Sequence, residues 1–317
     1  MRKTIVVPLD GSSLAARAVP YATRLARGTG GRLVFVQATL AQPLPGQSER
    51  EARAAATRRA EIELNAVVDR LRADGLTAEA RVYHEDAPTA ILDAAAQDGA
   101  DLIVMSTHGR SGLGRWVYGS VADRVLRAAT IPMLLVPAAC TGSWPADRPL
   151  RILVPLDGSP LAEAALGPAA ELARTLGAEL LLLQVLEYPL PAVADGGTYM
   201  PPWDQDADLA AARQYLEAIA DGLRATGQRV AVLAVAAPPS PVAQAVTTIA
   251  AVIQDEHVDA IAMGTHGRGG LARLVMGSVA TGVLQHATVP VLVVRPAATP
   301  ARDAQTAAQS ATGTATG

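Results

Sequence analysis

The sequence predicts an α/β protein made of two tandem, doubly wound parallel sheets, each Rossmann-like and with five strands. Three observations carry this prediction. One segment of the chain occurs twice, short apolar runs alternate with helix-like segments in each copy, and the 317 residues suffice for two domains of ordinary size. The repeat comes first in the argument, because an internal duplication sets how many units the fold contains.

Two pairs of segments match along the chain. MSTHGRSGLGRWVYGSVADR (105–124) and MGTHGRGGLARLVMGSVATG (263–282) are identical at 13 of 20 positions. In the same way, IVVPLDGSSLAARA (5–18) matches ILVPLDGSPLAEAA (152–165). We therefore divide the chain into a first domain (1–139), a linker (140–149), a second domain (150–297) and a tail (298–317) whose polar, small-residue composition predicts disorder.

In the first copy, five apolar runs are short enough to be buried parallel strands: 4–9, 32–39, 77–84, 101–107 and 131–137. Helices are expected between them at 13–30, which ends in glycines, at 49–73, which is rich in Arg, Glu and Ala, at 88–97 and at 117–128. Strands joined by helical crossovers give right-handed connections and a mostly parallel sheet.

The second copy repeats this order, with strands expected at 151–156, 178–185, 229–235, 259–265 and 289–295 and helices at 160–176, 206–225, 241–254 and 275–286. The segment 187–205 contains four prolines and is predicted to be a mobile loop. The last strand of each copy is an apolar sheet edge that suits pairing between the copies and between chains, which predicts a homo-oligomer through the last strands.

Composition excludes several classes of function. A net charge of −3 and an aromatic content of 3% argue against a nucleic-acid partner. The sequence has no uninterrupted run of 18 apolar residues, which a membrane span would require, and we expect a cytoplasmic protein. Lys3 is the only lysine, so a Walker A loop and a Schiff-base lysine elsewhere are excluded. Cys140 is the only cysteine and is expected to be a free structural thiol.

Ligands of open parallel sheets bind at the carboxyl ends of the strands, where the strand order reverses. At these points the first copy has Asp10, Gly11, Ser12, Ser106, His108, Gly109, Gly119 and Ser120. The second copy has Asp157, Gly158, Ser159, Gly264, His266, Gly267, Gly277 and Ser278. A glycine-dense loop that runs into a helix offers free backbone N–H groups and a positive helix end, which predicts a phosphate site.

Several of these side chains have a second interpretation. Ser120 and Ser278 fit helix N-caps as well as phosphate ligands. Asp10 and Asp157 fit N-caps of the first helix, but also hydrogen bonding to a base or ribose, or holding a metal together with phosphates.

The histidines and arginines of the loop are also open to two interpretations. His108 and His266 have no second histidine at ligand spacing and no adjacent carboxylate, which favours loop ordering over a general base or a metal ligand. Arg110 and Arg268 suit phosphate neutralisation or a solvated surface. No G-x-S-x-G elbow is present, so we assign no catalytic residue.

These motifs resemble the universal stress protein family, and the resemblance covers almost the whole chain as two tandem family domains. The family's nucleotide-binding pattern, G-x2-G-x9-G-[ST], is complete in the second copy at Gly264, Gly267, Gly277 and Ser278. The first copy has Ser106 in place of the first glycine and keeps Gly109, Gly119 and Ser120. The V-P-x-D-G-S segment after each first strand is similar to the family as well.

The resemblance implies an adenine nucleotide alpha hydrolase-like fold that binds ATP, often with a divalent metal, for which Mg²⁺ is the expectation. Asp10 and Asp157 would border adenine and ribose, and Ala38 and Val185 would meet the base through their backbone. The implied nucleotide-binding residues are Pro8, Asp10, Gly11, Ser12, Ala38, Met105, Ser106, His108, Gly109, Arg110, Gly119, Ser120 and Val121, and in the second copy Pro155, Asp157, Gly158, Ser159, Val185, Met263, Gly264, His266, Gly267, Arg268, Gly277, Ser278 and Val279.

Three functions follow from these observations. The first is an ATP-binding stress-response module whose occupancy alters its conformation or its choice of partner. The second is a slow ATPase or nucleotidyl-transfer enzyme on the same fold, with at most weak ATP hydrolysis. The third is a nucleotide-free dimerisation or scaffold protein. Because Ser106 departs from the pattern, we expect the second copy to bind nucleotide more securely.

Overall fold

The computed structural model describes residues 2–40, 43, 45–107, 119–140, 142–187, 203–238, 244–265 and 276–295, and the backbone of 192–194 and 197–199. The predicted tail, 298–317, lies outside the described residues. The first repeat contains β1 (Thr4–Pro8), the short 3-10 helix η1 (Ala15–Arg17), α1 (Ala18–Thr29), β2 (Arg32–Ala38), α2 (Glu49–Ala73), β3 (Thr77–Tyr83), α3 (Ala87–Gln97), β4 (Leu102–Ser106), α4 (Ser120–Ala128) and β5 (Met133–Val136).

The second repeat contains β6 (Arg151–Leu156), α5 (Pro160–Glu163), α6 (Leu166–Leu176), β7 (Glu179–Leu186), α7 (Gln205–Arg224), β10 (Val230–Ala236), α8 (Gln244–Asp255), β11 (Ala260–Gly264), α9 (Ser278–His286) and β12 (Val291–Val294). A small hairpin of β8 (Ala192–Ala194) and β9 (Gly197–Tyr199) lies within the segment predicted to be a loop. That prediction missed the hairpin, because neither three-residue strand has enough residues to show an alternating pattern.

Each predicted strand and helix of the two repeats has a counterpart, and local chemistry explains the boundaries. Helix α2 begins with a capping box, in which the Ser48 and Glu51 side chains and backbone N–H groups bond reciprocally. Helices α1 and α6 end at Gly30 and Gly177, which have φ of 60° and 64° and need glycine for that left-handed backbone.

The first helix of each repeat is broken, although the sequence predicts one continuous helix at 13–30 and at 160–176. In the first repeat η1 precedes α1, and in the second α5 precedes α6. Pro20 and Pro168 each stand at the third residue of the longer helix. A proline ring clashes with the carbonyl four residues earlier, so the preceding turn cannot continue as regular α-helix.

The predicted α/β fold class is confirmed, and the two five-stranded units are joined into one sheet. The strand order is β10-β7-β6-β11-β12-β5-β4-β1-β2-β3, so each unit has the doubly wound order 3-2-1-4-5. All described pairs in this sheet are parallel except β12 with β5, whose antiparallel register places Leu292 opposite Leu134. We call this pair the seam.

The seam settles where the apolar last strands pair. Their predicted pairing between the two copies is confirmed by the antiparallel register of β5 and β12. Their predicted pairing between chains is corrected, because β5 also pairs with β4 and β12 also pairs with β11. Both hydrogen-bonding edges of each strand are therefore occupied within the chain, and an oligomer has to use another surface.

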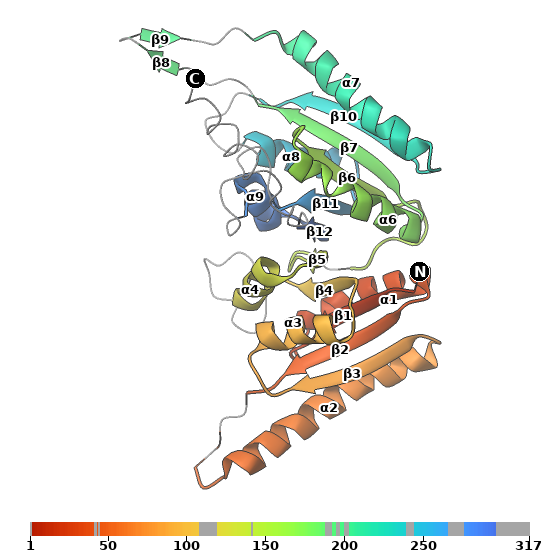
Figure 1. The fold of residues 1–317 in the computed structure, drawn as a ribbon, viewed down its shortest axis with the longest axis vertical. Coiled ribbons are helices and arrows are strands. Elements are labelled where there is room, and N and C mark those ends of the chain that lie inside the picture. The colour runs from red at the N-terminus through yellow and green to blue at the C-terminus, as the bar shows by residue number, and fades with distance from the viewer. Residues whose placement is uncertain are drawn as a thin grey trace, which may run out of the picture.

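Two apolar layers cover the faces of the sheet, and each is continuous across the seam. Helices α1, α2, α6 and α7 contribute to one layer, and α3, α4, α8 and α9 contribute to the other. Figure 1 shows α1 and α6 on one side of the central strands and α4 and α9 on the other. The repeats thus share a core instead of forming two separate globules.

Helices α1 and α6 pack against each other around the pseudo-two-fold axis that relates the repeats. Gly28 lies against Thr175, which is its own counterpart 147 residues further along the chain. A Cβ atom on Gly28 would lie 2.6 Å from the Thr175 carbonyl oxygen and 2.8 Å from Thr175 Cγ2. The close approach of the two backbones therefore requires glycine at this position.

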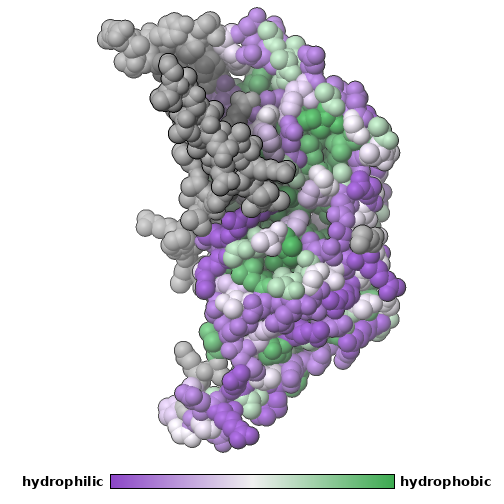
Figure 2. Space-filling view, in the orientation of Figure 1, coloured by the Kyte–Doolittle hydropathy of each residue, from purple (hydrophilic) through white to green (hydrophobic). Residues whose placement is uncertain are grey.

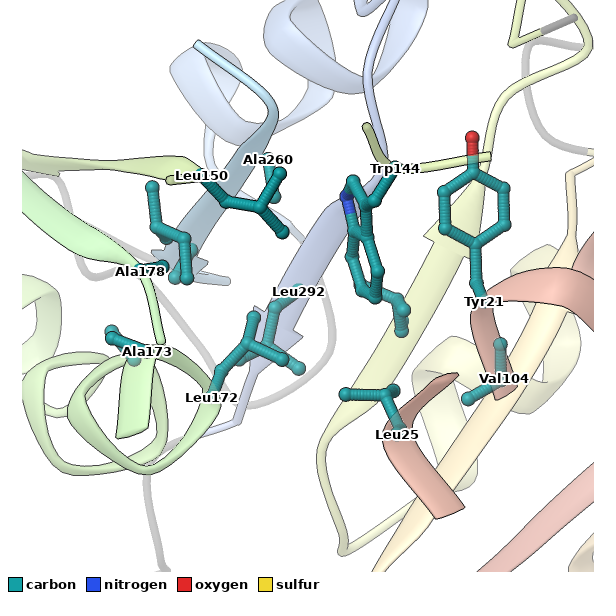
Figure 3. Close-up of a cluster of buried hydrophobic side chains, with 14 of the residues drawn as sticks. Tyr21, Leu25, Val104, Trp144, Leu150, Leu172, Ala173, Ala178, Ala260 and Leu292 are labelled. Atoms are coloured by element: carbon teal, nitrogen blue, oxygen red, sulfur yellow. The ribbon is translucent and has the colours of Figure 1, made fainter. Parts of the chain in front are cut away.

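The segment expected to be a linker is part of the core. Cys140 and Trp144 are buried, as is Leu150 directly after the segment. Figure 3 shows Trp144 between Tyr21 on one side and Leu150 and Leu292 on the other. The Trp144 and Tyr21 rings meet edge to face, with centroids 4.9 Å apart. The indole Nε1–H donates to the backbone oxygen of Asp259 at 3.0 Å.

Charged side chains fix the two ends of this segment. Arg17 donates to the carbonyls of Ala138 and Cys140, and Arg24 donates to those of Trp144 and Pro145. At the other end, Arg148 forms two bonds to the buried Asp259 carboxylate, at 2.6 and 2.8 Å. The segment is therefore bound to both repeats.

We expect Gly28→Ala to destabilise the protein by about 1–3 kcal/mol, because the added methyl group forces α1 and α6 apart. Gly222→Ala is the matched control, since Gly222 lies in α7 with nothing within 4 Å of an added Cβ. Alanine there should stabilise the protein by up to about 1 kcal/mol through helix propensity. Urea denaturation measures both changes, and equal effects would contradict the close α1–α6 contact.

The Cys140 thiol should be inert in the folded protein. Burial raises its pKa from 9.0 to about 11, against the lowering effects of Tyr21 and Arg17. Iodoacetamide at pH 8 should therefore modify Cys140 only after unfolding. Because the folded state favours the protonated thiol, its contribution to stability is complete below pH 9 and is lost as the pH rises through about 11.

Cys140→Ala is the control for that pH dependence. Burial also raises the pKa of Tyr21 to about 12, so this variant should keep only the part of the alkaline destabilisation that belongs to tyrosine. Rapid alkylation of the native protein, or an unchanged pH profile in the variant, would show that the thiol is not buried as described.

Candidate functional site

The strand order reverses between β1 and β4 in the first repeat, and a pocket of about 210 Å³ opens at this point. Eight of the residues predicted for the nucleotide site line it: Pro8, Asp10, Ala38, Met105, Ser106, Gly119, Ser120 and Val121. They come from the ends of β1, β2 and β4 and from the first turn of α4. The structure therefore brings together segments that are about 100 residues apart in the chain.

Thr107, which ends the apolar run 101–107 and follows Ser106, also lines the pocket. The remaining lining residues were not singled out from the sequence: Leu9, Ala15, Val36, Ala87, Ile91 and Ala122. Most are apolar, so the inner part of the pocket suits a flat, uncharged group. Ala87 and Ile91 are four residues apart on α3, and this helical spacing is the signal that could have placed them on one face.

The D-G-S segment after β1 is a closed turn with a defined hydrogen-bond pattern. The Ser12 N–H donates to Asp10 Oδ1 at 2.9 Å, and Ser12 Oγ accepts from the Ala15 N–H at 3.0 Å. Gly11 has a φ of 75°, which explains why glycine stands between them. No described residue bonds to the other Asp10 oxygen, which leaves it available to a ligand in the pocket.

The second repeat builds the same turn. Asp157 Oδ1 accepts from the Ser159 N–H at 3.0 Å and from its hydroxyl at 2.6 Å, and Gly158 has a φ of 80°. Ser159 Oγ in turn accepts from the Ala162 N–H at 3.2 Å, which caps α5. Serine is therefore the capping residue in this turn, and the N-cap interpretation of the aspartates is wrong. The aspartates instead hold the serine in place.

The first turn of α4 faces the pocket without a side-chain cap. Gly119 occupies the N-cap position and Ser120 is the first helical residue, as Gly277 and Ser278 are for α9. The N-cap interpretation of the two serines is thus corrected. The Gly119 carbonyl oxygen at the cap accepts a hydrogen bond from the Asp123 N–H at 3.1 Å. The N–H groups of the helical residues before Asp123 have no partner within the helix and are therefore open to an anion.

Serine at position 106 does not strain the backbone. Ser106 is the last residue of β4, pairs with Val136 and lies buried against the pocket. Its counterpart Gly264 ends β11 and pairs with Val294. Neither residue has a positive φ, so the first glycine of the motif is not required by backbone conformation. Serine adds only a small side chain at the pocket wall.

An ion pair joins the two helices that flank the pocket. Asp86 precedes α3 and lies 3.1 Å from the Arg124 guanidinium of α4. A hydrogen bond from Thr89, assisted by Arg124, lowers the pKa of Asp86. On α4, Asp123 bonds to Arg127 at 2.9 Å and raises the pKa of that arginine. Asp86 and Asp123 are thus engaged by arginines, and Asp10 is the carboxylate in the described lining of the pocket.

The rest of the predicted site divides into two groups. Pro155, Asp157, Gly158, Ser159, Val185, Met263, Gly264, Gly277, Ser278 and Val279 lie at the corresponding ends of β6, β7 and β11 and at the start of α9. His108, Gly109, Arg110, His266, Gly267 and Arg268 lie outside the described residues, so both interpretations of the histidines and arginines stay predictions. No group of three or more His, Cys, Asp or Glu side chains in the described part of the chain could hold a metal.

Comparison with known proteins identifies the family. The model of the universal stress protein family matches residues 1–137 and again 150–295. The chain belongs to the universal stress protein family. A universal stress protein of Mycolicibacterium smegmatis is 28% identical over 222 residues, which is 70% of each chain. One from Thermus aquaticus is 36% identical over 138 residues, 43% of this chain and 99% of its own.

The solved structures agree in fold. A universal stress protein from Archaeoglobus fulgidus superposes with a TM-score of 0.64 at 22% identity, over 92% of this chain and 96% of its own. Family membership supports a stress-response role. No helix within the described ranges is long and apolar enough to cross a membrane.

The two glycines that begin α4 and α9 should respond differently to substitution. Gly119 has φ 72° and ψ 141°, a region open almost only to glycine, whereas Gly277 has φ −60° and ψ 153°, which any residue adopts. We expect Gly119→Ala to cost about 1–3 kcal/mol and Gly277→Ala less than about 0.5 kcal/mol. Urea denaturation of both variants tests this, and equal costs would contradict the difference in backbone.

Proposed function

We propose that the protein is an ATP-binding regulatory module of the stress response, with one nucleotide site in each repeat. The observation that carries the proposal is the pocket at the β1–β4 crevice, which joins an apolar interior to the uncapped first turn of α4. An adenine nucleotide has the matching halves, because its base is flat and its phosphates are anionic.

The described residues fit the nucleoside part of such a ligand. At about 210 Å³, the described pocket is smaller than the roughly 300–1,000 Å³ of complete ligand sites. The apolar residues from β2, α3 and β4 would enclose adenine, and Asp10 would accept hydrogen bonds from the ribose. The phosphates would lie outside this space, against the N–H groups of Ser120 and Val121.

A divalent metal fits the site only together with phosphates. Mg²⁺ keeps several waters and is held in nucleotide sites by one or two carboxylates in addition to phosphate oxygens. Asp10 in the first repeat and Asp157 in the second would supply that carboxylate, as the alternative to accepting a hydrogen bond from the ribose. The metal would neutralise phosphate charge, and the protein's own part is to hold the Asp side chain through Ser12 or Ser159.

Binding without chemistry is favoured over the enzymatic alternative. A hydrolase needs a positioned base within hydrogen-bond reach of the attacking water, and the described pocket wall offers the Asp10 carboxylate but no histidine or lysine. A slow ATPase would have to use His108 or His266 as its base and the nearby Arg110 or Arg268 as its charge clamp. Steady phosphate release that is abolished by His266→Ala would support this alternative.

The cytoplasmic location expected from the sequence stays a prediction.

The deciding measurement is the amount of adenine nucleotide that denaturation releases per chain from freshly purified protein. We expect amounts near stoichiometric for the wild type and a loss of about tenfold or more for the double variant Ser120→Glu with Ser278→Glu. A carboxylate in the first turn still suits the helix dipole, so the fold should persist, but it repels phosphates from the same N–H groups.

The corresponding double Gln variant is the control, because it adds the same bulk without charge and should retain more nucleotide than the Glu variant. Gly277→Val tests the second repeat alone and should remove only the part of the released nucleotide that the second repeat binds. Wild-type protein that is empty after purification and shows no rise in melting temperature with added ATP would refute the proposal and favour a structural role.

A further inference from the structure

The outermost strand of the second repeat, β10, has one edge with no neighbour among the described strands. Its sequence, VAVLAVA, contains no charged or polar side chain. Six of its seven residues are only partly buried, whereas β5, β11 and β12 in the middle of the sheet are buried at every residue. An apolar strand with a free edge is a template for pairing with another strand.

The opposite end of the sheet shows how the same strand looks when its edge is protected. Strand β3 pairs with β2 in the same way as β10 pairs with β7, so β3 is the counterpart of β10. In these two registers Glu79 corresponds to Ala231, and Arg81 corresponds to Leu233. Glu79 and Arg81 form an ion pair at 2.7 Å. Charges on an edge strand discourage pairing, and β10 has an uncharged residue at both of these positions.

The apolar side chains on one face of β10 are only partly covered by the rest of the protein. Ala231, Leu233 and Val235 point to the layer of α8 and α9 but are only partly covered by it. Figure 2 shows apolar surface in the upper part of the molecule, where β7 and β10 lie in Figure 1. In β3 the corresponding face carries Glu79, Arg81 and Tyr83.

Backbone bonds show which groups of β10 point outward. Arg229 and Ala237, which flank the strand, bond inward to Leu180 and Leu186 of β7. In a parallel pair alternate residues face the same neighbour, so Val230, Val232, Ala234 and Ala236 direct their N–H and C=O groups away from the sheet. The outward Val230 oxygen is covered by Arg224, at 3.0 and 3.2 Å. The other outward groups need a partner or water.

The strand is complementary to itself. Antiparallel pairing of two β10 strands around Leu233 would set Val232 opposite Ala234, Ala231 opposite Val235 and Val230 opposite Ala236, so each valine meets an alanine. Leu233 would face its own copy, as Leu134 faces Leu292 at the seam. In this register the outward groups of Val232 and Ala234 bond to each other across the two-fold axis.

We propose that β10 is a dimerisation edge, at which two copies of the chain pair antiparallel around Leu233 and join their ten-stranded sheets. The occupant is a second copy because an uncharged, self-complementary strand gives an isologous contact, and because the chain already joins its own repeats by antiparallel pairing of two apolar strands. The proposal is independent of nucleotide binding.

Sedimentation analysis of the full-length protein tests the oligomer. We expect a dimer for the wild type at micromolar concentration and a monomer for Leu233→Arg, which places at this edge the residue found at the corresponding position of β3. Ile62→Arg is the control, since Ile62 is a large apolar side chain 71% exposed on α2, and this variant should stay dimeric. Circular dichroism confirms that both variants are folded.

Cysteine cross-linking tests the register and does not depend on the arginine variant. Non-hydrogen-bonded antiparallel pairs have Cα atoms about 4.5 Å apart, within the roughly 4.4–6.8 Å that a disulfide spans. Leu233→Cys should therefore form a disulfide-linked dimer on mild oxidation, and Val235→Cys, which would face Ala231, should not. Cys140 is buried and does not interfere.

Three outcomes would overturn the proposal. They are a wild type that stays monomeric at micromolar concentration, a dimer that persists in folded Leu233→Arg, and Val235→Cys chains that cross-link as readily as Leu233→Cys chains. The first would leave the edge open or covered by another segment. The second would place the dimer contact on another surface, and the third would exclude a register centred on Leu233.

Discussion

The antiparallel pairing of β5 with β12 is the contact on which the arrangement of the whole chain depends. It converts two five-stranded units into one sheet and makes both apolar layers continuous from one repeat to the other. It also determines the pseudo-two-fold axis, which brings α1 against α6 closely enough that Gly28 meets the backbone of Thr175. The only lysine, Lys3, then reaches Glu171 of the other repeat at 2.8 Å.

The segment between the repeats gains its packing from the same contact. Trp144 fills the space between α1 and β12 and bonds to Asp259 at the start of β11, while Arg17, five residues beyond the Ser12 turn, holds the other end of the segment. The segment between the repeats thus contacts β11, which leads to the glycine loop of the second repeat. It also contacts η1, the short helix that follows the Asp10 turn of the first repeat. The two candidate sites are parts of one packed structure and not independent modules.

Most of the fold could be predicted from the sequence, because short apolar runs, helix caps and an internal repeat are local signals. The seam could be named only as a possibility: the apolar runs 131–137 and 289–295 suit pairing within a chain and between chains equally well. The burial of Trp144 could not be predicted, since its neighbours Gly142, Ser143 and Pro145 are typical of loops and its partners are more than 100 residues away. Of the pocket lining, Asp10, Ser106, Gly119 and Ser120 could be predicted from their position after strands, and Pro8, Ala38, Met105 and Val121 from the family resemblance. The apolar wall from α3 was missed because it carries no polar signature.

The two repeats have diverged at corresponding positions, and each difference has a physical consequence. At the site, the first repeat has Ser106 and a glycine with positive φ before α4, whereas the second has Gly264 and an extended glycine before α9. At the outer strand, the first repeat has the ion pair of Glu79 and Arg81, whereas the second has Ala231 and Leu233. A duplicated domain that had to satisfy the same constraints at both ends would keep the same residue classes there. The charged pair on β3 and the uncharged strand β10 therefore fit the proposal that β3 faces water and that β10 pairs with a second copy of the chain.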